Sequence, residues 1–476
     1  MKNFHDSIFN AAIGHIPMAL EKLPAARILW INPKFKIYDS NIDRHLNLGE
    51  YETHLLNKCA YASINNLNDN NLSINAFADR YGGFGIGCNG GSGRAAYING
   101  YYVKGIGPTP LVGKTADKIH STGFIELNAC IKESIISECV ELEFPWGGVP
   151  TLAIIGTGIF KNEKMKKSSE LCLLVRPAFL RPAHFDRASF FLSALPIQGF
   201  HDSRRVKSMI MAAVKNFGAI EFKNIWHNLH ERWAEQLAYG FAHRFCHGGE
   251  SPSNIAIDGR LLDFGSMTTL PTWGKARTTI NNPVSGHELP IIINALRSII
   301  LQINYHNTGI QFSQEELLEL SEFTVKCYSN RVLIEVLRVL GLDLNQAKNV
   351  MGSDSGKIAK GINKIIIHYF SEYYTTFEYI PKSKKTWNLT DFWSGACDEI
   401  SYGLKNELIH AFDKSKLCFD LDRIKKINQK TAKTRFMLFH DQLWNSINSF
   451  TDNELIEKSA LNKFIINYVE NNSFAW

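Results

Sequence analysis

The chain has 476 residues, of which 45% are hydrophobic and 21% are charged, and its formal net charge is +6. This is ordinary globular composition with enough chain for a sizeable core. The basic clusters are short and lack an aromatic ladder, which argues against nucleic-acid binding and for solvated surface.

The nine cysteines are scattered and show neither a CxxC pair nor a metal-ligand spacing. Such a set is typical of reduced thiols in a cytosolic protein. No stretch is long and apolar enough to cross a membrane, and the first residues contain no uninterrupted apolar signal-peptide core. We therefore expect a cytoplasmic protein without a membrane span.

Residues 1–75 are mixed in character and are expected to form an N-terminal extension. We expect a helix near Ile8–Leu23 and a strand at Arg27–Asn32. The polar, asparagine-rich run Ser63–Asn75 is expected to be a loop.

Residues 76–187 are dense in glycine and β-forming residues and are expected to form a β-rich, nucleotide-binding lobe. The glycine-rich segment Tyr81–Arg94 comes first. Strands are then expected at Ala95–Ile98 and Tyr101–Lys104, with Asn99-Gly100 between them as a hairpin turn.

The second half of this lobe is expected to hold a helix and two more strands. Apolar residues at helical spacing predict a helix within Gly123–Leu142, ending before Pro145. Thr151–Ile159 and Glu170–Arg176 read as strands with a lysine-rich turn between them.

From about residue 188 the periodicity is helical, so an α-rich lobe is expected over 188–300 and a helical C-terminal region over 301–476. Ile225–Phe245 is expected to be one long amphipathic helix. The C-terminal region carries no recognisable chemistry, and its expected role is packing or recognition of a partner such as a partner enzyme. Its predicted helices include Glu315–Cys327, Val332–Leu340, Ile358–Tyr374 and Ile400–Phe412.

The segment after the long helix is typical of a magnesium site. A short ribbon is expected to turn at Asp258-Gly259, with Asn254 before it and Asp263 of an Asp-Phe-Gly sequence after it. An asparagine and an aspartate placed across such a ribbon hold the metal in protein kinases. His247 before the ribbon is expected to support the loop through backbone hydrogen bonds rather than to act as a base.

Four further side chains fit phosphate chemistry. Lys104 on a strand and Glu133 on the following helix match the lysine–glutamate pair of a kinase-like lobe, with Glu138 as the second choice for the acid. Arg176 and Arg181 lie between the two lobes and can clamp phosphate oxygens. The glycine-rich segment lets backbone N–H groups approach a phosphate closely, but it lacks the GK[ST] of a P-loop.

These segments, in this order, resemble the selenoprotein O family, whose members are pseudokinase-like enzymes that transfer AMP from ATP to protein side chains. The family's GDGRA, LKGAGRTP and LREYLxSEA patterns are echoed by Gly91–Ala95, Val103–Pro110 and Ile131–Cys139. Its LxRxAPSHIRxGxFE stretch and its metal-loop segment resemble Val175–Asp186 and Trp233–Ser266. The resemblance covers about residues 25–270.

The resemblance implies an α+β, protein-kinase-like fold of two lobes in which ATP lies reversed, so that its α-phosphate is attacked and AMP passes to a protein or peptide acceptor. Lys104, Glu133, Arg176 and Arg181 would serve catalysis. Asn254 and Asp263 would bind Mg²⁺. The cofactor-binding set implied for ATP is Gly91, Gly93, Arg94, Lys104, Arg176 and Arg181.

Two positions depart from the family. The aspartate before the metal asparagine, the family's candidate base, is Ser253, and the aspartate of GDGR is Ser92. A hydroxyl acceptor needs a base, whereas a carboxylate is already ionised, so the site also suits activation of a peptide carboxylate as an acyl-adenylate, as in siderophore-peptide (microcin) maturation. Glu250 or Asp258 are alternative bases. A catalytically inactive nucleotide-binding scaffold and a γ-phosphate kinase are the remaining alternatives.

Overall fold

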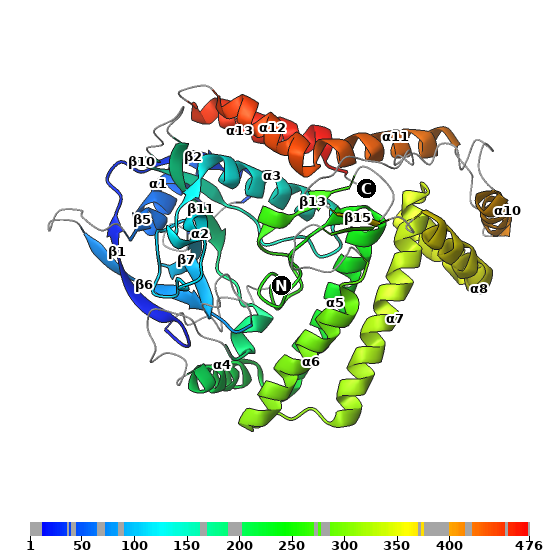
Figure 1. The fold of residues 1–476 in the computed structure, drawn as a ribbon, viewed down its shortest axis with the longest axis horizontal. Helices are drawn as coiled ribbons and strands as arrows, with labels where there is room; N and C mark the ends of the chain where they lie inside the picture. The colour runs from blue at the N-terminus through cyan, green and yellow to red at the C-terminus, as the bar shows by residue number, and fades with distance from the viewer. Residues whose placement is uncertain are drawn as a thin grey trace.

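The computed structural model describes residues 12–35, 38–39, 44–63, 72–83, 90–161, 169–188, 202–270, 275–277, 286–369, 373–375, 399–414, 421–452 and 456–474. The protein is mixed α+β: a curled antiparallel sheet is formed by the first part of the chain, and helices follow it (Figure 1).

The main sheet has the strand order β2-β10-β11-β8-β7-β6-β1-β5, and β9 pairs with β11 off this path. Its strands are β1 (Ile16–Lys22), β2 (Arg27–Ile31), β5 (Tyr61–Ala62), β6 (Ser73–Arg80), β7 (Gly91–Ile98), β8 (Tyr101–Lys104), β9 (Ile125–Glu126), β10 (Ala153–Lys161) and β11 (Ser169–Pro177). The strands expected from the sequence are all present. The β7–β8 turn has φ of 49° at Asn99 and 87° at Gly100, and positive φ at both central residues is the hairpin turn predicted for this dipeptide.

The prediction of a helix near Ile8–Leu23 is wrong for the residues of that range that the structure describes, 12–23. Residues 16–22 form β1, which pairs with β6 from Ile16 opposite Ala78 to Glu21 opposite Ser73. Pro17 has no N–H and is poorly suited to a helix interior, and pairing with β6 provides the hydrogen bonds that a helix would have made. The sequence predicts the end of an N-terminal extension at residue 75. Strand β6 of the main sheet continues across this position, from Ser73 to Arg80.

Helix α3 (Leu127–Glu143) packs against β10 and β11, and its outer side is covered by α12 (His440–Thr451) and α13 (Lys458–Asn472) (Figure 1). It is buried around most of its circumference because the sheet lies on one side and the C-terminal helices lie on the other, with Ile131 and Ile135 fully inaccessible. The C-terminal helices therefore hold α3 against the sheet.

Most of the described chain from residue 202 onward is helical, as expected, although Phe245–Cys246, Thr268–Thr269 and Lys275–Arg277 form short strands. The longer helices are α4 (Asp202–Phe217), α5 (Ala219–Ala242), α6 (Leu289–His306), α7 (Gln314–Val339), α8 (Leu344–Tyr369), α10 (Glu399–Lys414) and α11 (Leu421–Met437). Two expected helices, 315–327 and 332–340, are one continuous helix, α7. The helix expected to reach Tyr374 ends at Tyr369, and Tyr373–Thr375 form the short strand β15, parallel to β14 (Lys275–Arg277). Within the described ranges, no helix has the length and apolarity needed to span a bilayer.

Candidate functional site

A pocket opens between β7, β8, α3, the end of β11 and the loop that contains Asp263. It has a volume of about 700 Å³, including the space open to solvent at its mouth. Six side chains that the sequence predicts as site residues line this pocket, and they come from segments far apart in the chain. They are Arg94, Lys104, Glu133, Arg176, Arg181 and Asp263, beside Gly91 and Gly93.

Lys104 and Glu133 form the ion pair that was expected. Lys104 is the last residue of β8, and its Nζ lies 2.5 Å from Glu133 Oε1. The other carboxylate oxygen of Glu133 accepts from Arg176 at 2.9 Å. Glu138, the second choice, instead accepts from Asn32 and pairs with Lys34 at 2.7 Å, outside the pocket. One glutamate on α3 thus holds two cations at the floor of the pocket.

Asp263 is the second acidic residue that pairs with Lys104. Its Oδ1 lies 2.8 Å from Lys104 Nζ, and 43% of its side chain is exposed. Its φ of 55° is in the left-handed region, which places the carboxylate at the pocket while Phe264 is buried beneath Arg176. Burial alone would raise the pKa of Asp263, but the Lys104 ammonium and the Arg94 guanidinium outweigh it and hold that pKa well below its usual range. The carboxylate is therefore ionised at neutral pH, as a metal ligand must be.

The expected ribbon before Asp263 is present. The N–H of Leu262 donates to the carbonyl of Asn254, the N–H of Ala256 donates to that of Arg260, and Gly259 takes φ of 89° at the turn. His247 donates from Nε2 to the carbonyl of Leu262 at 2.6 Å, which is the supporting role expected for it.

Asn254 is half-buried and is not among the residues that line the pocket. Its Nδ2 donates to the carbonyl of Gly249 at 2.6 Å, which leaves Oδ1 as the atom able to bind a metal. A carboxylate from Asp263 and an amide oxygen from Asn254 are hard ligands of the kind Mg²⁺ prefers, and the backbone bond between Asn254 and Leu262 holds the two segments together. The donor set fits Mg²⁺.

Arg181 also lines the pocket, and a hydrogen-bond network not expected from the sequence holds it. Its guanidinium donates to Asp79 at 3.2 Å, to the Tyr102 hydroxyl at 2.8 Å and to the carbonyl of Ser253. Burial alone would raise the pKa of Asp79, but Arg181 and His184 outweigh it and keep the carboxylate ionised. Asp79 lies one residue before the end of β6 and belongs to no local motif, so only the sheet topology reveals its proximity to Arg181.

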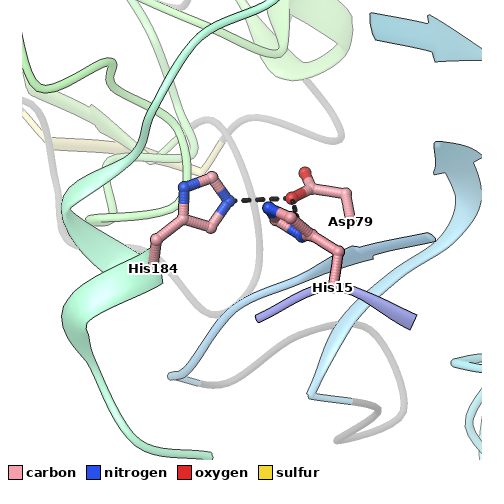
Figure 2. A group of neighbouring side chains, drawn as sticks. All are labelled: His15, Asp79 and His184. Atoms are coloured by element: carbon pink, nitrogen blue, oxygen red, sulfur yellow. Dashed lines mark hydrogen bonds and ion pairs between the residues drawn. The ribbon is translucent and has the colours of Figure 1, made fainter. Parts of the chain in front are cut away.

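His15, Asp79 and His184 cluster closely enough to suggest a metal centre, and Figure 2 shows both rings directed at the carboxylate. The hydrogen bonds exclude this reading. Nδ1 of His184 accepts from the Arg181 N–H at 3.1 Å, so its Nε2 carries the proton that is donated to Asp79 at 2.8 Å. Nδ1 of His15 likewise accepts from the Arg80 N–H at 3.1 Å. Neither neutral ring has a second lone pair for a metal, and burial lowers the pKa of His15 to about 3. The cluster positions Arg181.

The glycine wall is built by close backbone approach. A Cβ at Gly91 would lie 2.4 Å from the carbonyl oxygen of Asp79, so only glycine fits there. Gly93 and Arg94 follow on β7 and line the pocket. Residues 84–89 of the glycine-rich segment lie outside the described residues.

Neither of the two alternative bases, Glu250 and Asp258, lines the pocket, and neither does Ser253, which stands where the resemblance places a base. Ser253 shares a hydroxyl hydrogen bond of 2.7 Å with Ser251. Asp258 pairs with Arg260 at 2.8 Å. Glu250 accepts from the backbone N–H of Gly248 and lines a separate cavity behind the loop. No protein-family model matches the chain, and no curated protein is significantly similar to it.

Proposed function

We propose that the pocket binds Mg-ATP and that the protein transfers AMP to a protein or peptide acceptor, in a kinase-like two-lobed arrangement like that of the selenoprotein O family. The observation that carries the proposal is the bonding of Lys104 to both Glu133 and Asp263 at the pocket floor. A lysine held between a helix glutamate and the aspartate of an Asp-Phe-Gly sequence is the arrangement that protein kinases use for phosphates and metal.

The charges of the pocket support phosphate binding. Arg94, Arg176 and Arg181 surround the lysine, while only Glu133 and Asp263 oppose them among the described acidic residues that line the pocket. In the proposed complex Lys104, Arg176 and Arg181 hold the phosphates that leave as pyrophosphate, and Glu133 fixes two of these cations. Bound Mg²⁺ on Asp263 and Asn254 would neutralise phosphate charge as the transfer proceeds.

The nature of the acceptor separates two versions of this function. Position 253 is a serine and offers no carboxylate as a base. A peptide carboxylate is already ionised and can accept AMP without a base, and the product would then be an acyl-adenylate. A hydroxyl acceptor requires a proton acceptor from elsewhere in the pocket. A nucleotide-binding scaffold would keep the binding and lose the transfer.

ATP labelled at the α-phosphorus or at the γ-phosphorus, incubated with the protein, Mg²⁺ and a cell lysate, tests the proposal. We expect label to reach an acceptor only from the α-position, and Asp263→Asn to abolish it. Hydroxylamine then distinguishes the products, because it cleaves an acyl-adenylate and leaves a phosphodiester intact. Label transferred only from the γ-position would mark a kinase, and binding without any transfer would mark a scaffold.

A further inference from the structure

His120 and Asp117 form an imidazole–carboxylate pair at the mouth of the same pocket. His120 lies in the short helix α2 (Lys118–Ser121), and its Nδ1 is 2.6 Å from Asp117 Oδ2. The backbone N–H of His120 donates to the other carboxylate oxygen at 2.9 Å, which fixes the pair in one geometry. Because a carboxylate only accepts, Nδ1 of the neutral ring carries the proton and Nε2 keeps its lone pair.

The position of the pair suits contact with a large acceptor. His120 lines the pocket together with Val112, Gly113 and Ala116 of the preceding segment, and α2 contacts β7. Its side chain is 30% exposed and that of Asp117 is 57% exposed, so the pair is open to solvent. An acceptor that enters from outside would meet this wall before it reached Lys104.

The other ionisable side chains that line the pocket already have different tasks. Glu133 is held by two cations, and Asp263 is held by Lys104. Burial raises the pKa of Tyr81 to about 12, and it also raises the pKa of Tyr102. Among the described lining residues, His120 is the one histidine, and imidazole is the side chain that exchanges a proton near neutral pH.

We propose that His120, oriented by Asp117, takes the proton of a hydroxyl acceptor during AMP transfer. This inference rests on the proposed function. As the acceptor oxygen bonds to the α-phosphorus, Nε2 takes its proton, and the bond from that phosphorus to the α,β-bridging oxygen breaks, so that pyrophosphate leaves with the bonding electrons. The proton then passes from Nε2 to solvent. His120 is the catalytic residue of this step, and Asp117 is a positioning residue.

His120 lines the pocket, whereas Ser253 does not, and His120 would take the role that a carboxylate in place of Ser253 would have had. Asp117 lies beside the ring, and the charged residues that line the pocket together with His120 are Arg94, Lys104, Glu133, Arg176, Arg181 and Asp263.

The test is the rate of label transfer from α-labelled ATP across the pH range in which imidazole titrates, for wild type, His120→Gln and Asp117→Asn. We expect His120→Gln to lower the rate about 10²-fold or more and to remove its rise with pH. Asp117→Asn should lower the rate less and shift the profile. Both variants should keep the calorimetric affinity for Mg-ATP. His227→Gln, which changes an exposed histidine on α5, is the matched control.

Three results would overturn the inference. His120→Gln could transfer label at the wild-type rate and pH profile, or it could lose Mg-ATP affinity as much as it loses transfer, which would make His120 a binding residue. The labelled product of the wild type could also prove sensitive to hydroxylamine, which would show a carboxylate acceptor that needs no base. None of these three outcomes contradicts AMP transfer itself. A wild-type protein that transfers no α-label overturns the proposed function, and this inference with it.

Discussion

Glu143 of α3 and Arg435 of α11 form an ion pair of 2.7 Å in which both side chains are fully buried. The Tyr239 hydroxyl and the backbone N–H of Phe474 also donate to this carboxylate. The C-terminal helices are therefore bonded to the helix that carries Glu133, and through it to the pocket floor. The C-terminal region, for which the sequence predicts no catalytic role, thus helps to position Glu133.

Replacing Arg435 tests this anchoring. Arg435→Met leaves the Glu143 carboxylate buried without its cation, so we expect the free energy of unfolding to fall by about 3–5 kcal/mol. Lys433→Met changes an exposed residue of the same helix and should leave stability nearly unchanged. Urea unfolding of both variants measures the difference. Equal stability of the two would show that the ion pair does not fasten α3.

Lys104 is expected to act on the transfer step rather than on folding, because Glu133 keeps Arg176 as a partner when the lysine is removed. Lys104→Met should lower α-label transfer by at least ~10²-fold, as loss of a charge clamp typically does. Lys114→Met, at an exposed lysine, is the control. A Lys104→Met protein with wild-type transfer would refute its proposed contact with phosphate.

Asp263 is expected to carry the metal dependence of nucleotide binding. Asp263→Asn removes the charge that attracts Mg²⁺, so calorimetry should show that ATP affinity no longer rises when Mg²⁺ is added. The control is Asp258→Asn, which changes an aspartate of the same loop that pairs with Arg260 away from the pocket. Retained metal dependence in the Asp263 variant would refute the metal assignment.

Glu288 should make stability depend on pH. Burial and the neighbouring Glu250 raise its pKa from 4.5 to about 8 in the folded protein. The folded state then binds the proton more tightly than the unfolded state, so the stabilisation is complete below pH 4.5 and is lost as pH rises toward about 8. Glu288→Gln should flatten this fall in unfolding free energy, whereas Glu322→Gln on the exposed side of α7 should not. An unchanged slope in Glu288→Gln would show that another group causes it.

Local sequence chemistry predicted the elements whose signals are local. The Asn99-Gly100 turn, the ribbon before Asp263 and the long apolar helix α3 each follow from short-range turn or periodicity rules, and all are present. The sequence predicts a helix where β1 forms, because the identity of β1 depends on its pairing with β6, more than fifty residues away. Tertiary pairing decides such segments, and single-sequence periodicity does not contain it.

The same distinction applies to the site. Residue type and spacing were enough to select Lys104, Glu133 and Asp263, which the fold brings into contact. Asp79 and Tyr102, which hold Arg181, carry no motif and were not selected. The His120–Asp117 pair was not predicted either, although an aspartate just before a helix and a histidine three residues later form a local signal.

A crystal structure of the protein with Mg²⁺ and an ATP analogue that has a methylene group between its α- and β-phosphorus atoms tests the central proposal most directly, because this analogue binds but cannot donate AMP. We expect Mg²⁺ on Asp263 and Asn254, the β- and γ-phosphates on Lys104, Arg176 and Arg181, and the α-phosphate facing the mouth of the pocket. A γ-phosphate at the mouth, or a nucleotide bound outside this pocket, would contradict the proposal.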